Sequence, residues 1–171
     1  VLATLGEEAL RDEVLRGGYR LIDAPEDGRP AVTIVTTGVM APEAIDAAAE
    51  LDAEGVQASV IHLTSPDRVY RSWRAGFAAT TAAARVVRAP SQLHRLVPAD
   101  ERRRPIVSVH DAASHSLAWL GSALGTRQYA LGVDRFGESG TIADLYDITG
   151  ISTGSIVNAA LVAIADLDLY D

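Results

Sequence analysis

Residues 31–63, AVTIVTTGVMAPEAIDAAAELDAEGVQASVIHL, decide the fold because they combine two strand patterns with a helix pattern between them. Residues 31–37 form an almost continuous apolar and β-branched run, which is typical of a strand buried on both faces. Pro42 begins a helix and Gly55 ends it, since proline is tolerated in the first turn and glycine readily ends helices. A second β-branched run follows at residues 56–63. The stretch predicts a strand–helix–strand unit, and such a crossover joins parallel strands.

The same alternation continues on both sides of this unit. Residues 7–18 predict a helix that comes from a preceding part of the chain. This helix belongs to a lead-in segment, residues 1–18. Residues 65–67, Ser-Pro-Asp, have the composition of a helix start. Residues 105–110 and 129–133 predict two further strands, each followed by a helix pattern. Alternating strands and helices predict a three-layer α/β/α domain over residues 19–171.

Residues 78–104 show the least regular pattern. Residues 85–88 could form a short strand, and residues 93–97 a further half-turn. The charged stretch 100–104 indicates a long, exposed connection. Its three consecutive arginines, residues 102–104, could contact an anion or a partner, or could lie in a solvated loop, as charge runs usually do.

The composition excludes several classes of protein. Hydrophobic residues make up 48% of the chain, which excludes a disordered tail, and the absence of cysteine excludes disulfides and thiolate chemistry. Fifteen cations against 23 carboxylates give a formal net charge of −8, which argues against nucleic-acid binding. The sequence contains no run of about 18 apolar residues, so it predicts no membrane-spanning helix. We expect a cytoplasmic protein, and because Val1 replaces an initiating methionine, a piece of a longer chain.

A small cluster of imidazole and carboxylate groups follows the strand predicted at residues 105–110. His110, Asp111 and His115 lie where open α/β sheets place ligands. The cluster could bind a metal or another ligand, or its histidines could bond to backbone groups at a turn. Gly38, at the end of another predicted strand, could help to bind an anion through backbone N–H groups.

Motifs for nucleotide binding or serine catalysis are absent from the sequence. Neither a Walker A loop nor Gly-x-Gly-x-x-Gly occurs. Residues 137–140, Gly-Glu-Ser-Gly, come nearest to the Gly-x-Ser-x-Gly motif but lack its spacing. We therefore predict no catalytic, cofactor-binding or metal-ligating residue in this chain.

Three segments in the second half of the chain carry a family resemblance. Residues 105–112 (PIVSVHDA), 132–139 (GVDRFGES) and 145–151 (LYDITGI), followed by a Val-rich terminal helix, resemble the C-terminal domain of thiamine-diphosphate enzymes of the transketolase superfamily. The homodimeric decarboxylase component of the pyruvate dehydrogenase complex is the most similar member. The resemblance extends from about residue 8 to residue 167, and it implies a mostly parallel, mixed five-stranded sheet.

The resemblance implies the C-terminal domain of an enzyme that decarboxylates pyruvate or a related 2-oxo acid. Two alternatives are the same domain from a transketolase-type enzyme that acts on sugar phosphates, and a stand-alone α/β ligand-binding module. Thiamine diphosphate and magnesium would be bound by preceding domains, so this chain alone is expected to be inactive. The implied partners are those preceding domains, a second subunit in a homodimer, and the lipoyl acyltransferase core.

We expect the residues at the predicted strand ends to serve as structural contacts, or as contacts to a partner or an active-site entrance. They are Gly38, His110, Asp111, His115, Asp134, Arg135, Gly137 and Ser139. Asp134 could accept backbone N–H bonds that fix a turn, or could face the entrance, and Arg135 is the better candidate for an outward contact. Gly137 and Gly140 are predicted to adopt backbone angles that other residues avoid.

Overall fold

The described residues of the computed structural model (6–24, 27–85 and 91–168) contain a five-stranded sheet in the order β1-β3-β2-β4-β5. Its strands are β1 (Tyr19–Ile22), β2 (Ala31–Thr37), β3 (Gln57–Leu63), β4 (Ile106–Val109) and β5 (Gln128–Leu131). β2 pairs in parallel with both β3 and β4, and β4 pairs in parallel with β5. β1 runs antiparallel to β3. The mostly parallel, mixed sheet is therefore confirmed, although β5 ends two residues before the predicted strand.

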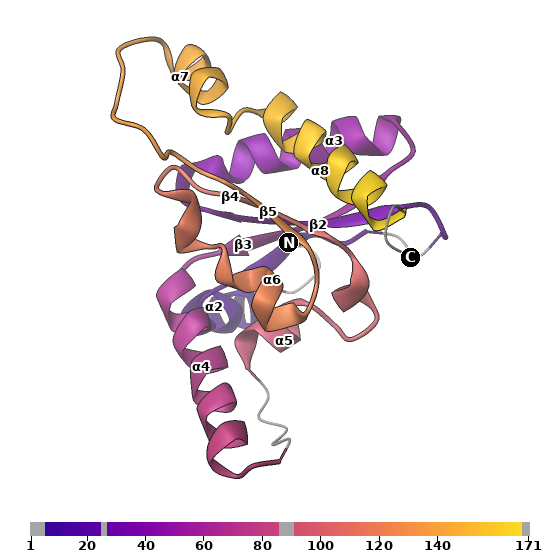
Figure 1. Cartoon of the computed structure of the whole chain (residues 1–171), viewed down its shortest axis with the longest axis vertical. Coiled ribbons are helices and arrows are strands. Elements are labelled where there is room, and N and C mark those ends of the chain that lie inside the picture. Colours follow the sequence, from indigo (N-terminus) through magenta and orange to yellow (C-terminus); the bar gives the residue numbers. More distant parts are fainter. Residues whose placement is uncertain (1–5, 25–26, 86–90, 169–171) are drawn as a thin grey trace.

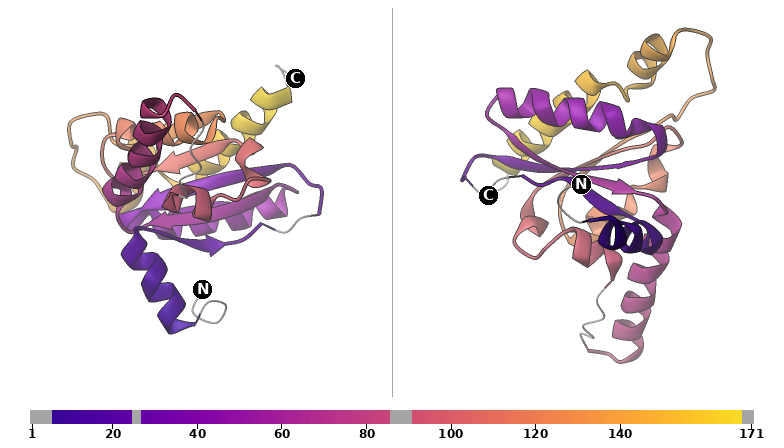
Figure 2. Two further views of the ribbon diagram at one scale, coloured as in Figure 1. Left: turned by 90° about the horizontal axis from the view of Figure 1, so that it is seen from below. Right: turned by 180° about the vertical axis from the view of Figure 1, so that it is seen from behind.

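Helices cover both faces of this sheet, as the alternation of patterns predicts. They are α2 (Glu7–Arg16), α3 (Ala41–Ala53), α4 (Pro66–Ala82), α5 (Gln92–Leu96), α6 (Trp119–Leu124), α7 (Ile142–Thr149) and α8 (Thr153–Asp168). Three short 3-10 turns are η1 (Gly38–Met40), η2 (Glu101–Arg103) and η3 (Ser114–Ser116). Figure 1 shows α3 and α8 on one side of the sheet and α4, α5 and α6 on the other, and Figure 2 shows these layers from two further sides.

The central strand β2 contributes to two separate hydrophobic cores. Val32 and Ile34 are fully buried in the core that the sheet forms with α3 and α8. Val35 lies in the opposite core, with residues of α5, α6 and the start of α4. Because successive side chains of a strand point to opposite faces, one short apolar run holds both layers of helices.

A contact between α3 and α8 fixes the position of the last helix. The Glu43 carboxylate in the first turn of α3 accepts hydrogen bonds from the Thr153 backbone N–H at 2.9 Å and from the Thr153 hydroxyl at 2.5 Å. A carboxylate stabilises a helix N-terminus because it faces unpaired N–H groups and the positive end of the dipole. Glu43 thus caps a helix that is 110 residues further along the chain.

Helix α4 contributes little to the core. Its aromatic residues are spaced for one face, but Val69 is its only buried residue among those that the structure describes. Tyr70 and Trp73 contact the ring of Trp119 on α6, with centroid distances of 5.1 and 5.4 Å. Phe77 remains 48% exposed, and the second half of α4 projects from the body of the domain (Figure 1). Only the first turns of this helix therefore belong to the core.

The charged connection before β4 is packed against the domain, and the prediction that it is exposed was wrong. Glu101 is 8% exposed and accepts hydrogen bonds from Arg20 of β1 at 3.0 and 3.1 Å. Arg104 donates to the hydroxyl of Ser59, and Arg102 donates to backbone carbonyl groups. Two of the three clustered arginines are thus structural, which neither sequence interpretation anticipated. The short strand considered at residues 85–88 falls largely outside the described residues.

One stretch of the described residues is long and apolar enough, by composition alone, to cross a membrane. It runs from Ile142 to Leu167, although no run of this kind was expected from the sequence. In the structure the stretch is two helices, α7 and α8, because Gly150 adopts a left-handed conformation with φ 73° between them. Residues of α8 such as Ile156 lie in the core against the sheet. The stretch therefore belongs to the folded domain.

We predict that Arg20→Ala destabilises the domain by about 2 kcal/mol, because it leaves the buried Glu101 carboxylate without its main partner. The free energy of unfolding in urea measures this loss. Arg71→Ala is the matched control, since Arg71 pairs with Asp67 at an exposed position and should cost about 0.5 kcal/mol or less. Equal losses for the two variants would contradict a structural role for the Arg20–Glu101 pair.

Candidate functional site

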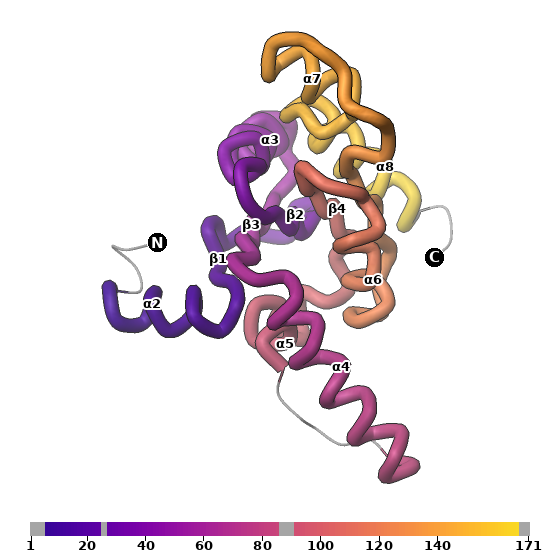
Figure 3. The backbone as a smooth tube through the Cα atoms, turned by 90° about the vertical axis from the view of Figure 1, so that its left-hand side faces the viewer, coloured from indigo at the N-terminus to yellow at the C-terminus, as the bar shows by residue number. Residues whose placement is uncertain are grey.

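The carboxyl ends of β2 and β4 form the topological switch point of the sheet. From β2 the chain passes through α3 to β3 on one side, whereas from β4 it passes to β5 on the other side. The connections that leave the two strands diverge, and open α/β sheets bind ligands in the crevice at such a point. We call this side of the domain the carboxyl edge; Figure 3 looks onto it, with α2, α4, α6 and α7 around the strand ends.

Three of the predicted residues meet at this switch point. Gly38 adopts φ 61°, and a Cβ built on it would lie 3.6 Å from Oδ1 of Asp111. Nε2 of His110 lies 3.5 Å from the same oxygen, while Nδ1 of His110 is buried and has no hydrogen-bond partner among the described residues. His115 stands apart on the exposed η3 turn. No group of three or more potential metal ligands occurs in the described part of the chain. The described residues therefore offer no set of donor atoms for the metal site considered at His110, Asp111 and His115.

Asp134 joins the end of β5 to the loop that follows β4. Its Oδ1 accepts a hydrogen bond from the Ser114 backbone N–H at 2.9 Å, and the Val133 N–H donates to the carbonyl oxygen of Ala112 at 2.9 Å. Hydrogen bonds from Ser114, with a smaller contribution from nearby His115, hold the pKa of Asp134 below its ordinary range. Asp134 thus accepts a backbone N–H bond, although the donor lies 20 residues away and not in its own turn.

Gly132 permits this junction because the two loops approach very closely. A Cβ at this position would lie 2.5 Å from the Ser114 backbone nitrogen and 2.6 Å from the Ala112 carbonyl oxygen. The prediction that Gly137 and Gly140 supply unusual backbone angles was wrong, since neither has a positive φ. Residues 134–141 make a wide loop, so no single residue has to turn the chain sharply.

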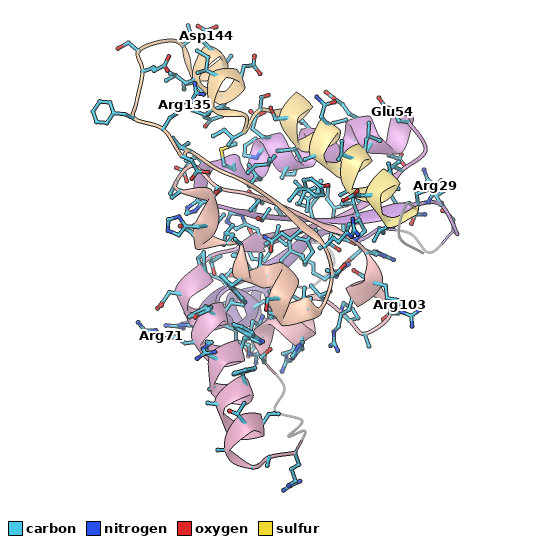
Figure 4. All side chains as sticks on the ribbon, viewed as in Figure 1. Arg29, Glu54, Arg71, Arg103, Arg135 and Asp144 are labelled. Carbon is cyan, nitrogen blue, oxygen red and sulfur yellow. The ribbon has the colours of Figure 1, made fainter. Side chains whose placement is uncertain are left out.

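The segment that we call the arm, residues 134–149, extends from this junction and comprises the wide loop and α7. Arg135 and Glu138 form an exposed ion pair at 3.7 Å, and Gly137 and Ser139 are also exposed. A capping box begins α7: the Asp144 N–H donates to the Thr141 hydroxyl at 3.3 Å, and the Thr141 N–H donates to the Asp144 carboxylate at 3.2 Å. The Thr141 hydroxyl also donates to Asp144 at 2.7 Å, and these hydrogen bonds from Thr141 lower the pKa of that carboxyl. Figure 4 shows Arg135 and Asp144 projecting from the arm, away from the sheet.

A surface groove of about 460 Å³ lies at the same edge, between the start of α4 and the η3 turn. It is lined by Pro66, Asp67, Tyr70, His115, Ser116 and Trp119. Of these residues, only His115 was predicted from the sequence to belong to a site. The other residues could have been found only from the order of the predicted elements. Pro66 and Ser116 each follow a predicted strand, and the carboxyl ends of parallel strands share one edge of a sheet.

The described residues of the carboxyl edge show neither a catalytic pair nor a metal site. Its imidazoles and carboxylates contact loops or solvent, and in the described residues no serine hydroxyl there bonds to His110 or His115, as a nucleophile and its base would. The described residues also lack a cluster of metal ligands. Among the predicted residues, the structure brings together Gly38, His110 and Asp111, while Arg135, Gly137 and Ser139 lie on the separate arm.

Comparisons with known proteins give a consistent family. The sequence-family model described as the transketolase-like TK C-terminal domain matches residues 17–152 of the chain. The plasmid-encoded and the chromosomal transketolases of Cupriavidus necator are 31% identical to the chain over 160 and 158 residues. These alignments cover 94% and 92% of this chain but 20% of each relative, so the chain spans about a fifth of their length.

Solved transketolase structures share the fold. A transketolase from Leishmania mexicana superposes with a TM-score of 0.61 at 22% identity, covering 91% of this chain and 19% of that one. A Pichia stipitis transketolase in complex with sedoheptulose-7-phosphate gives 0.61 at 20% identity, covering 94% and 20%. A split-gene transketolase described as an inactive β4 tetramer gives 0.55 at 19% identity, covering 88% and 43%.

We predict that Gly132→Ala destabilises the domain by about 1–3 kcal/mol, because the new methyl group overlaps the backbone of the loop that follows β4. Gly137→Ala is the control, since its Cβ meets nothing within 4 Å, and it should change stability by less than about 0.5 kcal/mol. Urea unfolding of the two variants measures the difference. A neutral Gly132→Ala variant would show that the close approach is not a constraint.

We predict that Asp134→Ala lowers the Tm at pH 7, and that this loss becomes progressively smaller as the pH falls below about 4. The folded-state pKa of Asp134 lies below its unfolded value, so its stabilisation is complete above about pH 4 and is lost as the pH falls through the folded pKa. Thermal scans between pH 3 and 7 measure the change. Glu138→Ala, in the same exposed loop, should show no such dependence, and an unchanged Tm for Asp134→Ala at pH 7 would refute the role of the junction.

Proposed function

Because the chain belongs to the transketolase-like TK C-terminal domain family, we propose that it is the C-terminal domain of a transketolase-type enzyme that acts on sugar phosphates. The observation that carries this proposal is the 31% identity to two transketolases across nearly the whole chain. A domain of this kind contributes structure and contacts to the enzyme. It supplies no reacting group of its own.

The sugar-phosphate alternative is better supported than the 2-oxo acid enzyme that the sequence resemblance placed first. Both curated relatives are transketolases, and so are the structures described above. The segment GVDRFGES at residues 132–139 carried much of the resemblance to the pyruvate dehydrogenase component. In the structure this segment is a junction and an exposed loop, which specifies how the domain is built and does not specify a substrate. The lipoyl acyltransferase core is a partner only of the 2-oxo acid enzyme.

We propose that thiamine diphosphate and magnesium are bound outside this domain. Magnesium prefers several oxygen ligands, and the described residues hold no group of three or more potential metal ligands. We therefore assign both cofactors to the part of the enzyme that this chain does not span. The lead-in segment 1–18, with α2, would connect that part to the domain, and we propose a cytoplasmic homodimer as the complete enzyme.

The carboxyl edge is the part of the domain best placed to contact the rest of such an enzyme. Gly38, His110 and Asp111 lie together at the switch point, and His115 lines the groove at the same edge. We assign these residues to the wall near an active-site entrance. Their role is to shape and orient, since none of them forms a pair of nucleophile and base in the described structure.

The complete enzyme that contains this domain should transfer a two-carbon ketol unit from a ketose phosphate to an aldose phosphate. Chromatography of the sugar phosphate products measures this activity, and radiolabelled pyruvate measures decarboxylation in parallel. The 171-residue chain alone is the control and should do neither. Release of CO₂ from pyruvate without ketol transfer would favour the 2-oxo acid enzyme. Absence of both activities from the complete protein would favour the stand-alone ligand-binding module.

A further inference from the structure

The arm exposes apolar side chains that a folded domain normally buries. Phe136 is 97% exposed, Ile142 is 70% exposed and Ile148 is 44% exposed. Helix α7 has no buried residue among its eight, although its sequence is rich in apolar residues. Exposed apolar patches usually mark sites of interaction with another protein, and these three side chains all lie on the arm. The arm therefore has the character of an interface.

The base of the arm is fixed, which sets it apart from a loose surface loop. Gly132, Val133 and Asp134 bind it to the loop that follows β4, through close packing and two hydrogen bonds of 2.9 Å. At the other end of the loop, the Thr141–Asp144 capping box fixes the start of α7. Phe136 lies between these two anchored points. A preorganised side chain loses less conformational entropy when a partner binds it, so this geometry favours tight docking.

The position of α2 indicates what covers this surface. Because β1 is antiparallel to β3, the chain enters the sheet at the carboxyl edge, where the Gly17 carbonyl oxygen accepts a hydrogen bond from the Ser65 N–H at 3.0 Å. The segment that precedes β1 therefore reaches the domain at the same edge as the arm, with α2 and α7 at different corners of that edge (Figures 2 and 3). Further exposed apolar residues lie on this edge, with Leu15 on α2 at 55% and Val39 on η1 at 59%.

We propose that the arm docks on the cofactor-binding part of the enzyme, with Phe136 inserted as the anchor and the Arg135–Glu138 pair at the rim. This inference rests on the proposed function, because the curated relatives are about five times as long as the chain and the matched family is a C-terminal domain. Most of such an enzyme precedes this domain. A buried aromatic anchor surrounded by charged rim residues is the usual arrangement of an energetic hot spot.

Hydroxyl-radical footprinting of the complete enzyme tests the inference, with phenylalanine oxidation measured by mass spectrometry. The chain contains only two phenylalanines, Phe77 and Phe136, so each serves as a reference for the other. The exposures in the isolated domain predict that Phe136 reacts faster than Phe77. In the complete enzyme we expect the order to reverse, with Phe136 protected about tenfold. Phe136 that remains the more reactive residue would overturn the proposal.

A pair of variants in the complete enzyme gives a second measurement. Phe136→Ala should increase the rate of proteolytic cleavage within residues 134–141 about tenfold, because the arm leaves its partner surface more often. Phe77→Ala, on the projecting end of α4, should leave that rate unchanged. Equal rates for both variants would count against docking by Phe136.

The sugar-phosphate function and the docking of the arm can be disproved independently of each other. If Phe136 is protected in an enzyme that decarboxylates a 2-oxo acid, the docking surface stands and the sugar-phosphate function is wrong. If the enzyme transfers ketol units while Phe136 stays reactive, the function stands and the docking surface is wrong.

Discussion

Strand β2 is the element on which the rest of the structure depends. It is hydrogen-bonded along both edges, to β3 and to β4, and six of its seven residues are buried. A strand in this position needs apolar cover on both faces, since its alternate side chains enter different cores. Helices α3 and α8 supply one cover and α5, α6 and the start of α4 supply the other. The same constraint creates the carboxyl edge, because connections that leave neighbouring strands toward opposite sides must diverge there.

The junction between residues 112–114 and residues 132–134 connects the sheet to the exposed arm. It binds the loop after β4 to the end of β5 through Gly132 and Asp134, and the arm begins directly beyond it. The arm can therefore be both exposed and well defined, with its base and α7 each held by named contacts. Such a combination suits a domain whose contribution to an enzyme is to dock and to position.

Site residues were predictable where they depend on strand ends, and unpredictable where they depend on contacts between distant segments. Gly38, His110 and Asp111 follow buried strands, so their place at one edge could be inferred, and the structure brings them together. The roles of Gly132 and Arg104 could not be inferred, because each depends on neighbours that are far away in the sequence. A glycine required by a close approach has no local signature, whereas Gly137 sits in a turn-like sequence that proved unconstrained.

Local sequence patterns specify the strands, the crossover and the helix starts of this protein, because burial, periodicity and capping act over a few residues. The runs at residues 31–37 and 56–63, the serine cap of α4 and the capping box of α7 all follow from neighbouring residues. Strand order, the Glu43 cap of α8, the buried Glu101 pair and the exposure of Phe136 do not. Each of these is decided by which surfaces meet after the chain has packed, and only the tertiary structure contains that information.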